Sequence, residues 1–145
     1  MVLRLPGNIA SVLGTTLVFA MCCSFALAET VTFSAELSGA NEVPPNDSAA
    51  SGLATVTFDT DTRMLSWSIT YEEMSGPVIG SHIHGPAGEG VNAGILVGLE
   101  PDLSPMEGSV EINDEQAGHI LNGETYINLH TEKYPSGELR GQLLR

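Results

Sequence analysis

Three of the four histidines in this chain have the residue type and spacing best suited to chemistry. His82 and His84 form an H-x-H pair, and residues two apart on a β-strand project from the same face, roughly 6.6 Å apart. Two imidazoles at that spacing can converge on one metal ion, and His130 would join them if the two segments pair as neighbouring strands. Imidazole nitrogens suit copper or zinc and are poor ligands for calcium or magnesium. The pattern therefore predicts a three-histidine copper or zinc site.

The same residues also fit a plainer interpretation, in which the imidazoles hydrogen-bond the Gly/Pro-rich segment 85–94 and bind no metal. The fourth histidine, His119, lies in a segment predicted to be helical and is interpreted as a surface residue. The sequence has no G-x-S-x-G nucleophile motif, and segment 85–94 lacks the lysine of a phosphate-binding loop. Any catalytic residues are therefore unknown at this stage.

Alternating apolar and polar residues predict the elements that position these histidines. Ile83 is expected to face the core, so His82 and His84 on either side of it should face away from the core. In segment 125–131 the apolar residues alternate with His130 in the same way, so His130 should also face outward. Asn113 is expected to cap a short helix over 114–121. The pattern favours an antiparallel Greek-key β-sandwich with one short helix, whose strands are expected over 30–37, 53–59, 64–71, 79–84, 95–99, 108–112, 125–131 and 138–143.

Composition narrows the classes of partner. The 145 residues carry 5 Lys+Arg against 18 Asp+Glu, a formal net charge of -13. A chain with so few basic residues cannot build the face that neutralises phosphates, so we expect no nucleic-acid partner and no anchoring to anionic lipid. The hydrophobic fraction of 42% is normal for a folded domain. The composition indicates a small, acidic, Gly-rich domain.

The first 28 residues have the features of a signal peptide. Arg4 precedes a long apolar run, and Ala26-Leu27-Ala28 has the small-x-small form of a signal-peptidase site. An uncleaved membrane anchor and a lipoprotein signal at Cys22 are the alternatives. Cleavage would leave residues 29–145 as one extracytoplasmic domain, periplasmic or secreted, with no stable membrane insertion. Because both cysteines precede the cleavage site, that domain would have no disulfide and no thiolate ligand.

Five segments in order resemble the CHRD-domain family, which is named after chordin and also occurs as a single domain in secreted bacterial proteins. The resemblance covers nearly all of residues 29–143. It implies an extracytoplasmic, immunoglobulin-like β-sandwich and implies little about activity. The matching segments are 37–45 (LSGANEVPP), 52–59, 82–87 (HIHGPA), 128–131 (NLHT) and 135–142 (PSGELRGQ).

The histidine pattern is also similar, more faintly, to the copper site of Cu/Zn superoxide dismutase. That family has an H-x-H strand pair, a late strand histidine and an arginine near the end that guides the anionic substrate. Arg140 could take that role here, although a cross-strand ion pair is its ordinary explanation. The bridging histidine, the zinc-loop ligands and the disulfide are missing, which puts dismutation in doubt and leaves a mononuclear copper site.

Three hypotheses follow. The first is a non-catalytic binding module with a copper or zinc ion on the three histidines, contacting an unidentified protein or small ligand through loops 41–45 and 85–94. The second is a mononuclear copper redox enzyme in which Arg140 steers an anion. The third is a metal-free structural or interaction domain. Glu132 and Glu138 would either orient an imidazole or belong to the acidic surface.

Overall fold

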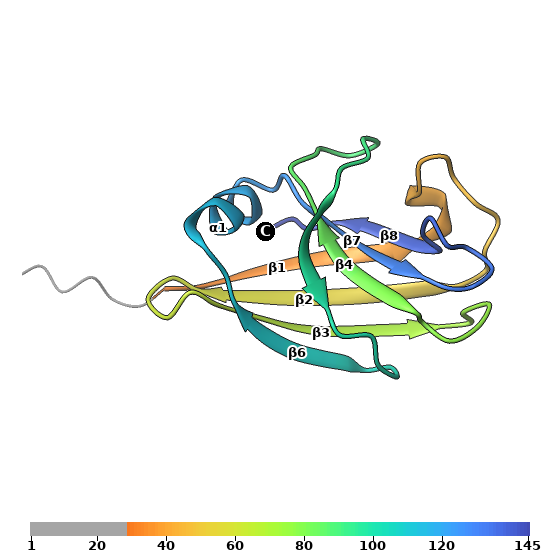
Figure 1. Cartoon of the computed structure of the whole chain (residues 1–145), viewed down its shortest axis with the longest axis horizontal. Helices are drawn as coiled ribbons and strands as arrows, with labels where there is room; N and C mark the ends of the chain where they lie inside the picture. The colour runs from red at the N-terminus through yellow and green to blue at the C-terminus, as the bar shows by residue number, and fades with distance from the viewer. Residues whose placement is uncertain (1–28) are drawn as a thin grey trace, which may run out of the picture.

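The computed structural model describes residues 29–145, which form an antiparallel β-structure with one short α-helix (Figure 1). A single 3-10 turn, η1 (Gly39–Asn41), follows the first strand. The elements are β1 (Thr30–Ser38), β2 (Ser51–Asp59), β3 (Met64–Glu72), β4 (Gly80–His84), β5 (Ile95–Leu99), β6 (Met106–Glu111), α1 (Asp114–Leu121), β7 (Tyr126–His130) and β8 (Leu139–Gln142).

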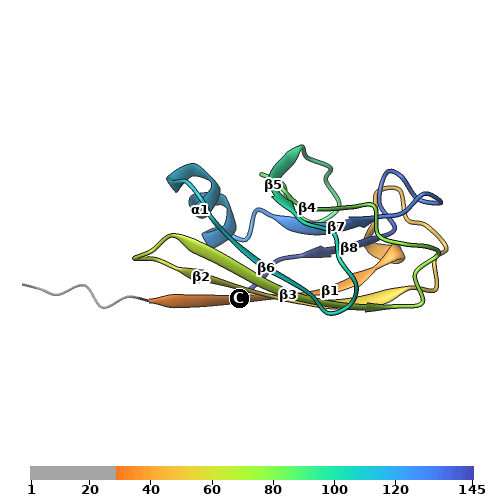
Figure 2. The same ribbon diagram turned by 60° about the horizontal axis from the view of Figure 1, so that its bottom comes forward.

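The strands pair in the order β5-β4-β7-β8-β1-β2-β3-β6, and every neighbouring pair is antiparallel. The β7–β8 hairpin lies between β4 and β1. The sheet folds over itself, so that β1, β2, β3 and β6 form one layer and β4, β5, β7 and β8 the other (Figure 2). The pairing between β8 and β1 is short: within these two strands, Ser38 and Arg140 form the single residue pair. The expected all-β class with one short helix is confirmed.

The core lies between the two layers and follows from the two-residue period of the strands. On β1, Val31, Phe33, Ala35 and Leu37 are buried, while the residues between them face outward. The second layer contributes buried aliphatic residues from β4 and β7, and Ile83 is among them. Each large aliphatic side chain buried in this way contributes roughly 1.5–3 kcal/mol. This packing fixes which face of β4 and β7 points away from the core.

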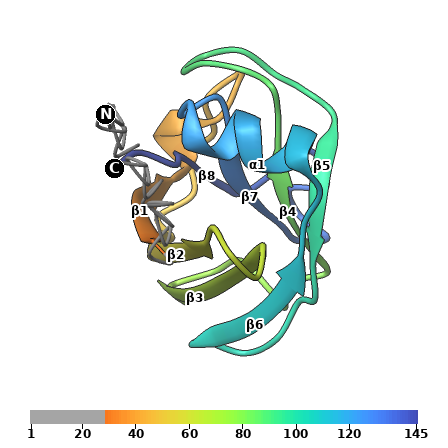
Figure 3. The ribbon, with the colours of Figure 1, turned by 90° about the vertical axis from the view of Figure 1, so that its left-hand side faces the viewer.

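The helix begins where the sequence predicts. Asn113 accepts a hydrogen bond from the Gln116 backbone N–H at 2.9 Å, and the Gln116 side chain accepts one from the Asn113 N–H at 2.9 Å. This reciprocal capping satisfies two donors that a helix start otherwise leaves unpaired. Ala117 and Ile120 are the buried residues of the helix, which lies across one end of the folded sheet (Figure 3).

Within residues 29–145, no helix is long and apolar enough to cross a membrane. The predicted signal peptide, 1–28, lies outside the described residues and stays a prediction.

Candidate metal centre

The three candidate histidines come together because β4 and β7 are neighbouring strands. In the antiparallel register, His82 lies opposite Asn128, His84 opposite Tyr126, and Gly80 opposite His130. All three imidazoles therefore project from the outer face of this pair: His82 and His84 follow each other along β4, and His130 on β7 lies diagonal to His82. A Cβ at position 80 would lie 3.3 Å from His82 Cε1 and 3.5 Å from His130 Cδ2, so the glycine there leaves room for the rings. The predicted juxtaposition is confirmed.

The three imidazoles form a compact group. One ligand nitrogen from each of His82, His84 and His130 lies within 4.8 Å of the others, and all three residues are half-buried. The ring centroids are 5.0 Å apart for His82 and His130, 5.5 Å for His82 and His84, and 6.0 Å for His84 and His130. Three nitrogens at this separation can bind one copper or zinc ion with a coordination position left open.

Two of the rings are oriented by backbone carbonyl groups. His84 Nδ1 donates to the Ala93 carbonyl at 2.9 Å, and His130 Nδ1 donates to the Pro135 carbonyl at 3.1 Å. This makes Nε2 the unprotonated nitrogen of each ring, which is how metal-binding histidines are usually held. His84 Nε2 is buried and has no hydrogen-bond partner among the described residues. His82 Nδ1 lies 3.2 Å from His130 Nε2 and donates to it.

The surroundings favour the neutral imidazoles that metal binding requires. Burial lowers the pKa of His82 below its ordinary value of 6.5, and the neighbouring His84 lowers it further. Burial also lowers the pKa of His130, outweighing the opposite effect of the Pro135 hydrogen bond. Both shifts favour the neutral form of the imidazole, which is the form that binds a metal ion.

A stack of three side chains supports His84. The Tyr126 ring is nearly parallel to the His84 ring, with centroids 5.1 Å apart, and the Arg140 guanidinium carbon lies 3.6 Å from the Tyr126 centroid on a cation–π contact. The Tyr126 hydroxyl also accepts from the Ala93 N–H at 3.1 Å. Tyr126 thus contacts both the His84 ring and the residue whose carbonyl orients it.

Arg140 takes neither role expected from the sequence. It is 2% exposed, and its guanidinium donates to the Asn92 side chain at 2.8 Å and to the Val91 carbonyl at 2.7 Å. It has no ion pair within the described residues. The loop after β4 covers the Arg140 side chain, so the guanidinium fixes that loop instead of facing bulk solvent, and Arg140 also lines a cavity beside that loop.

We expect Tyr126→Leu to free the His84 ring. The wild-type protein should hold His84 as the Nδ1–H tautomer, because the Ala93 carbonyl is an acceptor. Without the stacked ring and its hydroxyl, this should become a mixture of both tautomers. Two-bond ¹H–¹⁵N spectra of the imidazoles measure the change. Unchanged His84 nitrogen shifts in the variant would contradict this prediction. The control is the same pair of spectra for Tyr134→Leu, which replaces a half-buried tyrosine in another loop.

A family model described as the CHRD domain matches residues 33–143, which span almost the whole described region. The chain is a member of the CHRD-domain family. The expected resemblance is therefore confirmed, and CHRD domains are binding modules that are typically extracellular. The comparisons do not confirm the fainter similarity to the superoxide dismutase site.

A shorter similarity points to a different kind of protein. A 55-residue stretch is 46% identical to proteins named elongation factor Ts from Anaplasma marginale, strains Florida and St. Maries. It covers 37% of this chain and 19% of theirs, so the CHRD protein spans about a fifth of the length of the curated relatives it matches. No solved structure matches it significantly.

Near the histidines, this CHRD domain has a buried hydrogen-bonded pair, the Glu42 carboxylate and the Asn128 side-chain amide. The Asn128 amide nitrogen donates to both Glu42 oxygens, at 3.0 and 3.2 Å, and Glu42 is 7% exposed. Burial raises the pKa of Glu42, and the Asn128 hydrogen bond and the charge of Arg140 offset this only in part. Gly137, with φ of 134°, passes so close that a Cβ would meet Glu42 Oε1 at 2.5 Å. The pair thus joins the loop after β1 to the outer face of β7.

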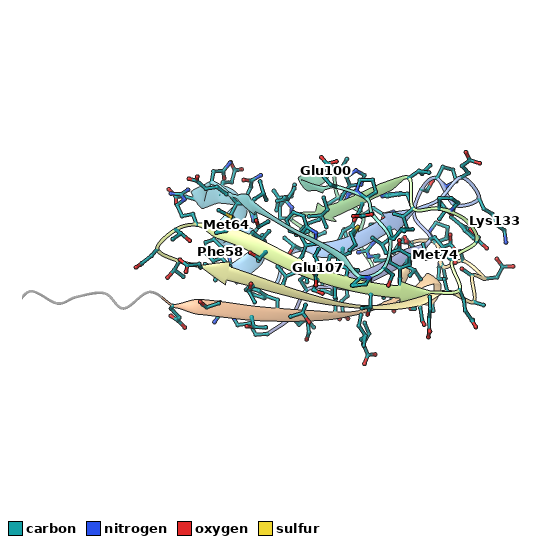
Figure 4. All side chains as sticks on the ribbon, turned by 90° about the horizontal axis from the view of Figure 1, so that it is seen from below. Phe58, Met64, Met74, Glu100, Glu107 and Lys133 are labelled. Atoms are coloured by element: carbon teal, nitrogen blue, oxygen red, sulfur yellow. The ribbon has the colours of Figure 1, made fainter. Side chains whose placement is uncertain are left out.

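Glu138 is neither an imidazole partner nor a surface acid. It is fully buried, and its carboxylate accepts from the Ser48 hydroxyl at 2.6 Å, from the Ser75 N–H at 2.9 Å and hydroxyl at 2.6 Å, and from the Thr131 hydroxyl at 2.5 Å. These donors come from three loops at one end of the sandwich, where Lys133 projects into solvent (Figure 4). The sequence-based interpretation of Glu138 was wrong, because the packing of these loops encloses it.

His119, interpreted as a surface residue, lies on α1 away from the other histidines. Its Nδ1 is 3.0 Å from Glu124 Oε2. It takes no part in the three-histidine group.

Proposed function

We propose that this CHRD-domain protein is an exported binding module that holds a copper or zinc ion on His82, His84 and His130. The convergence of three imidazole nitrogens within 4.8 Å of one another carries the proposal. Two further features support it: backbone carbonyls orient two of the rings, and the lowered pKa values of His82 and His130 keep those rings neutral. Neither copper nor zinc is favoured over the other by three imidazoles alone.

Export rests on the sequence of residues 1–28, with its apolar run and its Ala26-Leu27-Ala28 ending. The family supports the same location, since CHRD domains are typically extracellular. Cys22 and Cys23 would leave with the signal peptide. The exported protein would then have no cysteine thiolate to compete with the histidines for copper or zinc.

A mononuclear copper redox enzyme is the weaker candidate. Substrate guidance in that hypothesis depends on Arg140, whose guanidinium is buried against Tyr126 and bonded to the loop at Val91 and Asn92. The net charge of -13 also repels an anionic substrate. We therefore propose binding and not catalysis.

His84→Ala tests the proposal with a matched control on α1. We expect zinc affinity in calorimetric titration to fall at least a hundredfold, because loss of one of three ligands leaves a pair that binds weakly. The metal-free variant should stay folded, since it loses only the hydrogen bond to the Ala93 carbonyl and the stack on Tyr126, which together contribute about 1–2 kcal/mol. His119→Ala should bind zinc as wild type does. Unfolding of metal-free His84→Ala, or unchanged affinity, would contradict the assignment.

A further inference from the structure

A cavity of about 430 Å³ lies on the outer face of β8, between the loop that follows β1 and the loop that follows β4. Its walls include Glu42 from the first loop and Glu89 from the second, and its floor includes Arg140 and Gln142 of β8. None of the three candidate metal ligands lines it. It is therefore a second site, separate from the histidines, formed by the two loops most suited to recognition.

Two buried groups of opposite charge line this cavity without a direct salt bridge to each other, although the charge of Arg140 partly offsets the effect of burial on the pKa of Glu42. Glu42 is 7% exposed and Arg140 is 2% exposed, yet the ion pairs within residues 29–145 join other residues. The Glu42 carboxylate is bonded to the neutral Asn128 amide, and Arg140 to neutral groups at Asn92 and Val91. A buried charge is costly unless an opposite charge compensates it. Each would gain a partner from a ligand that carries both signs.

The hydrogen-bonding groups that line the cavity also suit a ligand that carries both charges. A guanidinium has five N–H donors, and Arg140 directs one each to Asn92 and Val91, which leaves donors for an anion. The Gln142 side-chain N–H₂ group donates hydrogen bonds to the carbonyls of Ala87 and Gly123, both at 2.9 Å, and this fixes the orientation of the amide. The Gln142 Oε1 atom is then left buried without a partner. The cavity thus offers donors at Arg140 and acceptors at Glu42 and Gln142.

We propose that this cavity binds a free α-amino acid in its zwitterionic form. The α-carboxylate accepts from Arg140, and the α-ammonium donates to Glu42 and to the Gln142 oxygen. A volume of about 430 Å³ accommodates the backbone and a small or medium side chain. A ligand with one charge would give a direct ionic partner to only one of Glu42 and Arg140, so the site should select for both charges together.

The first experiment compares ligands on the wild-type protein, which needs no variant to fold. L-alanine and L-glutamine are titrated by calorimetry beside N-acetyl-L-alanine, which lacks the ammonium, and L-alaninamide, which lacks the carboxylate. We expect each zwitterion to bind at least tenfold more tightly than either one-charge analogue, because each analogue loses a charge-assisted contact. No binding by any of the 20 common amino acids, or equal binding of zwitterions and analogues, would overturn the proposal.

The second experiment places the ligand. Glu42→Gln keeps the shape of the side chain and should weaken alanine binding at least tenfold, whereas Glu100→Gln, at an exposed position that does not line the cavity, should leave binding nearly unchanged. The triple His82, His84, His130 to Ala variant should still bind alanine, which separates this site from the proposed metal centre. Equal weakening by Glu42→Gln and Glu100→Gln would contradict the assigned position.

Discussion

Replacing Glu138 by glutamine is expected to lower the free energy of unfolding by about 3 kcal/mol, since the wild-type carboxylate accepts from four donors in a site closed to water. A carboxamide presents an N–H₂ group to some of those donors, so that donors face each other and stay unsatisfied. Urea unfolding at neutral pH measures the loss. Glu132→Gln on the exposed side of the same loop is the control, with an expected change near zero.

The same residue should give the protein part of its acid sensitivity. Burial by itself would raise the pKa of Glu138, but the hydrogen bonds from Ser48, Ser75 and Thr131 outweigh it and hold the pKa below its ordinary value of 4.5. The stabilisation is therefore complete above the unfolded-state pKa and is lost as the pH falls through the lower pKa of the folded state. The stability difference between wild type and Glu138→Gln should be constant above about pH 5.5 and shrink below pH 4.5. A difference that grows on acidification would contradict this account.

Removing all three imidazoles should abolish stoichiometric copper and zinc binding. The described residues contain a single group of three or more candidate ligands whose atoms converge, namely His82, His84 and His130. Scattered surface carboxylates bind these ions weakly, so no site of comparable affinity should remain in the triple alanine variant.

The fold of the triple variant should persist, because the core between the two layers consists of residues on the opposite phase, such as Ile83 and Leu129. Retention of one copper or zinc per chain in the folded variant would show that the ion binds elsewhere. Circular dichroism before metal addition provides the check on folding.

The positions of the histidines could be predicted because they depend on local periodicity. Ile83 and the apolar residues of β7 alternate with polar ones, and alternation determines which side of a strand each residue faces. The strand pairing of β4 and β7 was a further assumption, and the register confirms it. The helix was equally predictable, since Asn113 and the acids after it are local signals for a helix start.

The groups that hold the histidines could not be predicted in the same way. The Ala93 and Pro135 carbonyls belong to loops, and no side-chain pattern marks which backbone oxygen a loop will direct at a ring. Arg140 and Glu138 were misjudged for a related reason. Both were expected on the outward face of a strand over 138–143, and loops distant in sequence cover them. Burial of an outward face depends on the path of those loops, which is a tertiary property.

The measurement that tests the central claim most directly is Cu(II) electron paramagnetic resonance with metal analysis, on the purified protein and on the triple His82, His84, His130 to Ala variant. We predict one copper per chain with hyperfine structure from imidazole nitrogens in the wild type, and loss of that spectrum in the variant. No bound copper or zinc after addition of either ion, or identical spectra from the two proteins, would contradict the metal centre and leave the domain as a metal-free binding module.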